Sequence, residues 1–500
     1  MARTKSSNPY TYYSGGQTHS IKFARLGAES AAYRPMAKSK RFGIRRRKKE
    51  PIRDSRSAVT TTLRAQRKRL CGDFPRFHDM SETDTLAAPA GNDTMIIPTE
   101  TMIVEVGRRS ELSWLRNNFG MTVIQEGRRG KCLLQAAEGG REGVRTVFEA
   151  SRAAYTRIST HVAHPNFLRV VRRPAPATGS STYFWNLDNQ ETGNKGIPGA
   201  DVHALAAWTI TEGDSDIRVA VLDEGVDSTH PYLKDAIVDE ADFVDGNSTG
   251  RPSGDDAHGT ACAGIVGSRH KKYRGLAPGV SLIGVRIAKS DNQGFWIFDD
   301  FDTADAIDWS WDEAHADVLS NSWGGGPPSD AITRAFERAR TRGRNGKGAV
   351  VVVAAGNDQR LVDFPGNLPS VLTVGASNQW DKRKTTTSAD GEYWWGSNYG
   401  PGLDVMAPGV KIPTTDIRGG RGYDSTLVTP NFNGTSSACP HVAAAAAMIL
   451  SIKPGAAEAQ VREAINQSAD PLVSSLGWDR FTGHGRLNTY EALRIARRTL

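Results

Sequence analysis

The sequence predicts an α/β protein whose larger part is a doubly wound, mostly parallel sheet, preceded by a small α+β domain and a disordered basic N-terminal region. Two observations carry this prediction. From residue 183 onward, short apolar runs alternate with segments of helical periodicity, the pattern of parallel strands joined by helices. Residues 93–173 instead have the order β-α-β-β-α-β, which is typical of a small ferredoxin-like domain.

The N-terminal region, residues 1–92, is predicted to be disordered because it lacks hydrophobic periodicity. The chain has a net charge of +8, but residues 37–70 alone hold fourteen Lys or Arg against two acids, so the rest of the chain is net negative. This basic run is interpreted as a solvated tail. The alternative is an arm that binds nucleic acid or an acidic partner.

The small domain is expected over residues 93–173, and its composition gives a linker at 174–182 and a larger domain at 183–500. A Gly-Arg-Arg-Gly turn between two short apolar runs predicts a hairpin inside the small domain. Its expected elements are a strand at 95–106, a helix at 110–118, hairpin strands at 121–125 and 131–135, a helix at 141–157 and a strand at 167–171.

The larger domain alternates buried strands with helices. Its strands are rich in Val, Ile and Leu, as expected of strands that are covered on both faces. The predicted strands lie at 217–222, 282–287, 318–320, 349–355 and 371–374. The predicted helices lie at 262–267, 303–314, 331–340, 440–452, 456–467 and 489–498.

Composition argues against several classes of protein. Four cysteines in 500 residues do not make a disulfide framework. We find no run of about 18 apolar residues, so no membrane span is expected. The first twenty residues lack the apolar region of a secretory signal. The expected location is therefore the cytoplasm, or outside the cell by a non-classical route.

Three polar residues stand where strands end or helices begin. Asp223 follows a predicted strand, and the carboxyl ends of strands are where α/β sheets place their sites. His258 opens a helix of small residues and can act as a general base. Ser436 stands at the start of another helix, whose positive end favours negative charge, and Pro440 is assigned to its first turn. Each residue alone also has a structural explanation: a loop cap, a buried histidine or a helix cap.

Taken together, these motifs resemble the subtilisin family of serine proteases, in which the order along the chain is Asp, His, Ser. The resemblance covers about residues 183–500. The three principal matches are Asp223-Glu-Gly-Val-Asp-Ser-Thr-His-Pro, His258-Gly-Thr-Ala-Cys-Ala-Gly and Asn433-Gly-Thr-Ser-Ser-Ala-Cys-Pro-His-Val-Ala. Further matches are Gly275-Leu-Ala-Pro, Ser320-Asn-Ser-Trp-Gly-Gly, Ala354-Ala-Gly-Asn, Asp404-Val-Met-Ala-Pro-Gly and Gly483-His-Gly-Arg-Leu-Asn.

The resemblance implies a role for each matched residue. Ser436 is expected to attack the scissile carbonyl, His258 to carry its proton to the leaving amine, and Asp223 to hold the imidazole tautomer. Asn357 is expected to donate a hydrogen bond to the oxyanion. Asp358, at the rim of the primary pocket, is expected to favour a basic or long side chain or merely to be solvated. The other expected substrate-binding residues are Ser322, Trp323, Gly324, Gly325, Ala354 and Gly356.

Two departures from the family pattern affect the predicted site. Tyr232 stands where the family usually has an Asp that ligates its tight calcium ion, and residues 268–275 form a cationic loop nearby. This calcium site is therefore predicted to be absent. No cofactor is predicted, and the sequence leaves open whether other calcium sites exist. Glu224 follows Asp223 where Thr or Ser is usual, and its side chain is expected to point elsewhere, as it does in the family.

In the family, a ferredoxin-like propeptide assists folding and inhibits the enzyme. Residues 93–173 are expected to act in this way as an intramolecular inhibitor, with self-cleavage between about Val170 and Tyr183. Peptide or protein substrates are the other expected partners. Two alternatives stay open: a pseudoenzyme that binds without cleaving, and a nucleic-acid-tethered module in which the basic run supplies the main function.

Overall fold

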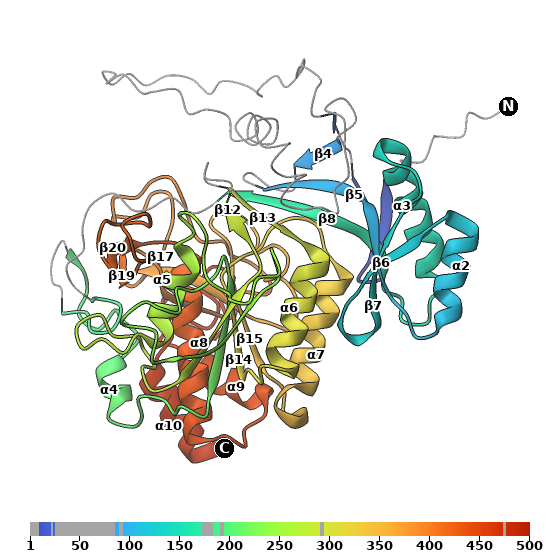
Figure 1. Ribbon diagram of the computed structural model, residues 1–500. Coiled ribbons are helices and arrows are strands. Elements are labelled where there is room, and N and C mark those ends of the chain that lie inside the picture. Colours follow the sequence, from blue (N-terminus) through green and yellow to red (C-terminus); the bar gives the residue numbers. More distant parts are fainter. Residues whose placement is uncertain are drawn as a thin grey trace, which may run out of the picture. The chain divides into compact units, whose positions relative to one another are not determined.

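The computed structural model describes residues 10–21, 24–25, 86–89, 94–172, 184–190, 195–290, 295–473 and 477–500. The chain forms two compact units (Figure 1). The N-terminal unit holds residues 1–125 and 133–170, and the C-terminal unit holds 126–132 and 171–500. Residues 126–132 thus group with the larger unit, unlike the predicted boundary. The basic run at 37–70 and the predicted linker at 174–182 lie outside the described residues.

The predicted β-α-β-β-α-β order is present in the smaller part of the chain. Its elements are β5 (Thr94–Glu105), α2 (Arg109–Phe119), β6 (Thr122–Glu126), η1 (Arg128–Gly130), β7 (Lys131–Gln135), α3 (Gly140–Tyr155) and β8 (Ala163–Arg172). The strands pair in the order β8-β5-β7-β6. Helix α3 buries Val144, Val147 and Phe148, because these apolar residues recur at helical spacing along one face.

The prediction that residues 1–92 lack regular structure is wrong for several short segments. They form β1 (Thr11–Ser14), β2 (Gln17–Ser20), β3 (Ala24–Arg25) and β4 (Leu86–Pro89). Gly15 and Gly16 both adopt positive φ in the two-residue turn between β1 and β2, as such hairpins require. Tyr12 is fully buried and packs edge-on against Phe167 at 5.4 Å. The alternating stretch is too short to stand out in the sequence.

The C-terminal unit contains the predicted doubly wound sheet. Its strands are β9 (Arg218–Asp223), β10 (Ile237–Asp242), β11 (Ser281–Arg286), β14 (Val318–Asn321), β15 (Val350–Ala354), β16 (Leu372–Asn378), β17 (Lys382–Arg383) and β18 (Val405–Pro408). They run in the order β10-β11-β9-β14-β15-β16-β17, with β18 also on β16, and every pair except β16·β17 is parallel. The strand order reverses beside β9, and ligands of open α/β sheets bind at such a switch point.

Helices cover this sheet, and α8 lies at the centre of the unit (Figure 1). The helices are α4 (Ala204–Trp208), α5 (His258–Gly267), α6 (Asp300–Asp312), α7 (Asp330–Gly346), α8 (Thr435–Ile452), α9 (Glu458–Ser468) and α10 (Thr489–Thr499). Side-chain caps fix where three of them begin: Asp299 caps α6, Ser329 caps α7 and Asn488 caps α10. The run of alanines in α8 allows close packing against β14, β15 and β16.

Several strands of this unit were not predicted. They are the hairpin strands β12 (Lys289–Ser290) and β13 (Phe295–Asp299), the pair β19 (Ile412–Thr415) and β20 (Val428–Phe432), and the strands β10, β17 and β18. Strand β10 is half-exposed and carries three acids, so it lacks the apolar signal of the buried strands. The others have five residues or fewer.

Helix α8 qualifies the expectation about membrane spans. Within the described residues, it is the one helix long and apolar enough to cross a bilayer. Most of it is buried inside the C-terminal unit, and the core helix of a folded domain passes the same test. Ser, Thr, His and Pro interrupt its apolar residues, so the sequence run alone did not reveal it.

Candidate active site

The carboxylate of Asp223 and the imidazole of His258 meet at the carboxyl end of the sheet. Asp223 is the last residue of β9, and His258 is the first residue of α5. Both carboxylate oxygens lie 2.9 Å from His258 Nδ1. The backbone N–H of Glu224 donates to Asp223 Oδ1 at 2.8 Å, which fixes the carboxylate. An Asp in this position can hold the ring with Nδ1 protonated and Nε2 free to act as a base.

Ser436 lies beside this pair at the N-terminal end of α8. Its hydroxyl donates to the backbone carbonyl of Ser322 at 3.3 Å. His258 Nε2 is buried and makes no hydrogen bond within the described residues, so the bond to Ser436 Oγ is not formed here. Cys262 Sγ bridges the two helices, at 3.7 Å from His258 Nδ1 and 3.5 Å from the Ser436 carbonyl oxygen. The hydroxyl must leave Ser322 before it can donate to the imidazole.

Pro440 shapes the helix that carries Ser436. It lies four residues after Ser436, in the second turn of α8 and not the first as the sequence interpretation placed it. A proline has no N–H, so the Ser436 carbonyl loses its helical donor. The side chain of Ser322 donates to that carbonyl at 3.0 Å instead. This bond ties the start of α8 to the end of β14.

Asn357 lies three residues after the end of β15 and contacts the segment before Ser436. Its side-chain oxygen accepts hydrogen bonds from the Thr435 N–H at 2.8 Å and from Thr435 Oγ1 at 3.1 Å. A Cβ added to Gly434 would lie 3.3 Å from Asn357 Nδ2, and Gly434 has a φ of +110°. This position therefore needs glycine on both counts. Because the oxygen of the Asn357 carboxamide is the acceptor in these bonds, its nitrogen is the end that can donate a hydrogen bond to a substrate.

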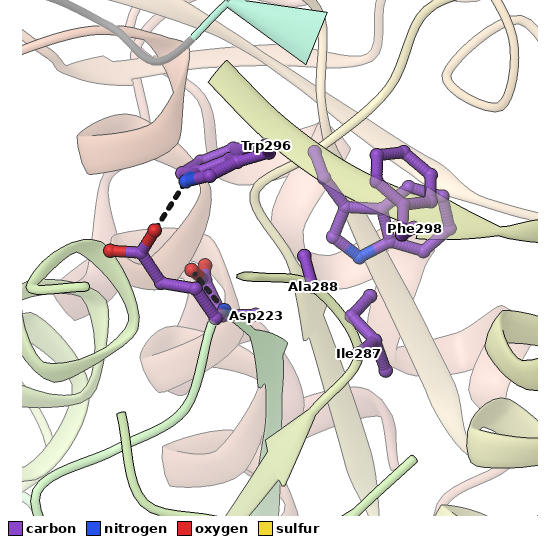
Figure 2. Close-up of a pocket in the computed structure, with 7 residues that line it drawn as sticks. Asp223, Ile287, Ala288, Trp296 and Phe298 are labelled. Carbon is purple, nitrogen blue, oxygen red and sulfur yellow. Dashed lines mark hydrogen bonds between the residues drawn. The ribbon is translucent and has the colours of Figure 1, made fainter. Parts of the chain in front are cut away.

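Sequence reasoning placed the side chain of Glu224 away from this site, and that expectation is wrong. Glu224 is fully buried, and its Oε1 accepts a hydrogen bond from the backbone N–H of His258 at 2.6 Å. Its Oε2 accepts a hydrogen bond from the indole N–H of Trp296 (Figure 2). The Trp296 ring meets the His258 ring edge-to-face, with centroids 4.5 Å apart. On the sequence, Trp296 lies in no recognisable motif.

An apolar pocket opens next to Asp223. Trp296 stands on one side, Phe298 on the other, and Ile287 and Ala288 below them (Figure 2). Trp323 also lines the pocket and packs edge-on against Phe298, with ring centroids 5.9 Å apart. Trp323, one of the expected substrate-binding residues, thus lines a pocket. Phe298 and Trp296 come from β13, a strand that the sequence did not predict.

The other candidate substrate-binding residues lie at two strand ends. Ser322 directly follows β14, and Ala354 is the last residue of β15. Gly324 and Gly325 continue from β14, and the Gly325 N–H donates to the Phe364 carbonyl at 2.8 Å. Gly356 follows β15, and its N–H donates to Thr435 Oγ1 at 3.0 Å.

Asp358 is paired, not merely solvated. Its carboxylate accepts a hydrogen bond from Arg360 Nε at 3.0 Å, and Arg360 also forms an ion pair with Asp363. Arg360 thus shares its single charge between two carboxylates, and the charge of Asp358 is partly compensated within the chain.

Two cysteines and a second histidine near the site have structural roles. Burial raises the pKa of Cys262 well above its usual value and that of Cys439 to about 11, so both are thiols at neutral pH. Burial also lowers the pKa of His441 to about 4. The His441 ring is held by Asn186 at 2.9 Å and by the Ser437 carbonyl at 2.8 Å.

The region of the expected calcium site is aromatic. Tyr232 stacks on His270, with centroids 4.0 Å apart, and Tyr273 lies in the same stack. Within the ranges that the structure describes, the one group of three potential metal ligands is Asp223, His258 and Cys262, whose ligand atoms lie within 4.8 Å of one another. Tyr232 and His270 offer no carboxylate oxygen, which is the ligand that a tight calcium site needs.

Known proteins resemble this chain in sequence. A model of the subtilase family matches residues 214–485. A calcium-dependent protease of Nostoc sp. (strain PCC 7120 / SAG 25.82 / UTEX 2576) is 28% identical over 442 residues, which cover 80% of this chain and 64% of that protein. Thermitase of Thermoactinomyces vulgaris is 32% identical over 58% of this chain and 93% of its own length.

Solved structures give the same fold. Fervidolysin from Fervidobacterium pennivorans matches with a TM-score of 0.61 and 22% identity, over 79% of this chain and 60% of that chain. The chain spans slightly less than two thirds of the calcium-dependent protease named above. The family model nonetheless covers more than half of the sequence, and thermitase aligns over nearly its whole length. This chain belongs to the subtilase family.

Proposed function

We propose that this protein is a serine endopeptidase in which Asp223, His258 and Ser436 form the catalytic triad. The observation that carries the proposal is the Asp223 carboxylate, 2.9 Å from His258 Nδ1 at the switch point of the sheet, with Cys262 in contact with both that imidazole and the Ser436 carbonyl at the start of α8. A subtilase that only binds peptides would not need this arrangement. Family membership supports the same reaction.

In the proposed reaction, Ser436 Oγ attacks the carbonyl carbon of the scissile peptide bond. His258 Nε2 takes the hydroxyl proton and passes it to the leaving amine, while Asp223 stabilises the imidazolium. Water then hydrolyses the acyl-enzyme by the reverse proton route. Asn357 Nδ2 and the Ser436 N–H donate to the oxyanion in both steps.

Substrate is expected to bind as an extended strand between residues 322–325 and 354–356. These segments end two neighbouring parallel strands, β14 and β15, so they present backbone groups at the same edge of the sheet. Asp358 is a weak specificity residue in this proposal because Arg360 partly compensates its charge.

Self-processing from an N-terminal inhibitor is the second part of the proposal. The ferredoxin-like element order supports it, and so does the grouping of residues 126–132 with the C-terminal unit. Within that unit, the fully buried ammonium of Lys131 forms an ion pair with Asp308, which also pairs with Arg338 at 2.8 Å. Breaking such a buried pair is costly, so this segment should stay bound after the chain is cut.

We also propose that the family's tight calcium site is absent. The residues present do not fit the ion, because the Tyr232–His270 stack supplies no carboxylate and the surrounding loop is cationic. Dialysis against a chelator should leave this loop intact. A calcium-dependent change in tryptic cleavage within residues 268–275 would contradict this part. The cytoplasmic or non-classically exported location and the nucleic-acid arm stay predictions.

Purified protein and its Ser436→Ala variant, incubated with a proteome-derived peptide library, test the proposal. We expect cleaved peptides only with the unmodified protein, and an intact mass showing cleavage between about Val170 and Tyr183. The variant should stay full length. Normal maturation of the variant would exclude self-processing, and equal peptide cleavage by both would exclude Ser436 as the nucleophile.

A further inference from the structure

Residue 224 contacts three parts of the candidate site. Its backbone N–H holds Asp223, and its carboxylate accepts hydrogen bonds from the His258 N–H and the Trp296 indole. The Glu224 side chain is fully buried, so its two hydrogen bonds are shielded from water. We propose that Glu224 positions Trp296 as a wall of the apolar pocket, and that the pair determines which substrate side chain this pocket accepts. This inference rests on the proposed function.

The two walls of the pocket are held in different ways. On one side, Phe298 contacts Trp323 at 5.9 Å, and Trp323 stacks on Phe336 at 6.0 Å, so this wall is supported by packing. On the other side, Trp296 packs edge-to-face against His258 and is tied by its indole N–H to Glu224. Loss of the Glu224 carboxylate therefore removes the hydrogen bond that orients Trp296, and it leaves the packing of Phe298 and Trp323 unchanged.

The same carboxylate links the pocket to the imidazole. Glu224 Oε1 is 2.6 Å from the backbone nitrogen of His258, at the first residue of α5. The orphan N–H groups at a helix start need acceptors, and a carboxylate is also favoured there by the helix dipole. Glu224 therefore acts as a positioning residue, and Trp296 as the specificity-determining residue that would touch substrate.

The side chains that line the pocket indicate which kind of substrate side chain it can bind. Its lining beyond the two carboxylates is aliphatic and aromatic, and both carboxylates are occupied by hydrogen bonds to His258 and Trp296. The pocket should thus take an apolar side chain of the peptide substrate, with an upper size set by Trp296. Anionic side chains should be excluded, since the lining holds two carboxylates and no cation that could compensate a negative charge.

Four variants test the proposal. Trp296→Phe keeps an aromatic ring but cannot donate to Glu224. Glu224→Gln keeps the shape but offers only one acceptor oxygen to two donors. The double variant Glu224→Gln/Trp296→Phe completes a double-mutant cycle, which measures the coupling between the two residues. Trp395→Phe is the matched control, because Trp395 donates to Glu392 at 2.9 Å in an equivalent buried pair away from this pocket.

The readout is a ratio of kcat/KM values for quenched peptides that carry Ala or Phe at one position on the acyl side of the scissile bond, scanned position by position. At one position, we expect each single variant to shift the Ala-to-Phe ratio towards Phe by about tenfold, in the range that one apolar group gives in a pocket. The double variant should shift it no further than the larger single effect. Trp395→Phe should leave the ratio unchanged.

Several outcomes would overturn the proposal. Unchanged ratios in Trp296→Phe, additive shifts in the double variant, or an equal shift in Trp395→Phe would each show that Glu224 is only a buried helix cap. A ratio does not depend on the fraction of folded enzyme, so a loss of stability alone cannot imitate the effect. If the unmodified protein cleaves no peptide, the proposed function fails. If it cleaves peptides with unchanged selectivity in the variants, only this inference fails.

Discussion

The side-chain oxygen of Asn357 accepts a hydrogen bond from the backbone N–H of Thr435 at 2.8 Å, and this bond sets which end of the carboxamide remains to donate. Thr435 precedes Ser436, so the donor and the nucleophile are connected through one residue. The oxygen is also held by Thr435 Oγ1 at 3.1 Å. Oriented donors of this kind require no reorganisation as charge develops on the substrate.

Replacing Asn357 should separate catalysis from stability. Asn357→Ala removes both the donor and the acceptor for Thr435, whereas Asn357→Asp keeps the acceptor and loses the donor. We expect kcat to fall by about 10²–10³-fold in both, a range measured for such a donor in a subtilisin itself. Steady-state kinetics and chemical denaturation check this. Equal kcat for Asn357→Asp and the unmodified protein would contradict the assignment.

Mercury should inhibit the protein through Cys262. The Cys262 sulfur lies 3.7 Å from His258 Nδ1 and 3.5 Å from the Ser436 carbonyl, so a bound Hg²⁺ would displace the imidazole. Burial keeps the thiol protonated, so inhibition should be slow. Cys262→Ala should retain activity in mercury, while Cys439→Ala should be inhibited like the unmodified protein. Full activity after stoichiometric labelling of Cys262 would refute this.

His203 should make stability depend on pH. The hydrogen bond with Asp470, at 2.8 Å, raises the pKa of His203 above its usual value. Burial alone would raise the pKa of Asp470, but hydrogen bonds from His203 and Asn488 and the charge of Arg486 lower it to about 2. Asp470 thus stays ionised at ordinary pH, and its own contribution is lost only as the pH falls towards about 2.

A raised histidine pKa stabilises the fold fully below the unfolded value of about 6.5, and the contribution fades as pH rises through the folded pKa. His203→Asn should therefore cost more unfolding free energy at about pH 5.5 than at about pH 8.5. Asn suits the positive φ of 55° at this position. Urea unfolding in a Ser436→Ala background measures both values. Equal costs at the two pH values would be inconsistent with this role.

Lys384 should be essential for the segment after β16. Its buried ammonium donates hydrogen bonds to the backbone carbonyls of Thr385 at 2.7 Å and Trp395 at 3.1 Å. It also forms an ion pair with the Asp390 carboxylate at 3.3 Å. Burial lowers the pKa of Lys384, and the charge of Asp390 opposes that shift. Lys384→Met would leave a buried carboxylate without its counter-charge, and we expect a loss of about 3–5 kcal/mol in unfolding free energy.

The control for Lys384 is an exposed ion pair in the same unit. Arg494 contacts Glu491 at 2.7 Å on the surface of α10, so Arg494→Ala should cost less than about 1 kcal/mol. Glu392 lies in the segment that Lys384 holds, and its side chain accepts from Asn433 at 2.9 Å. The activity of Lys384→Met should therefore fall as well. Similar losses of stability in the two variants would count against a special role for Lys384.

The sequence was sufficient for the large sheet and for the residues that stand at its strand ends. Asp223 and Asn357 follow buried apolar runs, and His258 and Ser436 open helices of small residues, so local pattern and family resemblance both mark them. In the structure Asp223 contacts His258, Cys262 contacts both His258 and the Ser436 carbonyl, and Asn357 contacts the residue before Ser436. The predicted order of the small domain was recovered as well.

What the sequence missed depends on contacts between distant residues. Glu224 and Trp296 are 72 positions apart, and the meaning of each lies in the hydrogen bond to the other. Strand β13, which carries Trp296, has five residues and no alternation of polar and apolar positions. Tyr12 was assigned to a disordered region because its partner Phe167 is supplied by a strand far along the chain. No local pattern encodes such pairs.

Labelling with a fluorophosphonate tests the central claim most directly. The reagent reacts with a serine only when a neighbouring base and oxyanion donors activate its hydroxyl. We expect stoichiometric modification of Ser436, located by peptide mass spectrometry, and strongly slowed modification in His258→Ala and Asn357→Ala. No labelling of the matured protein, or labelling that persists in Ser436→Ala, would contradict the account.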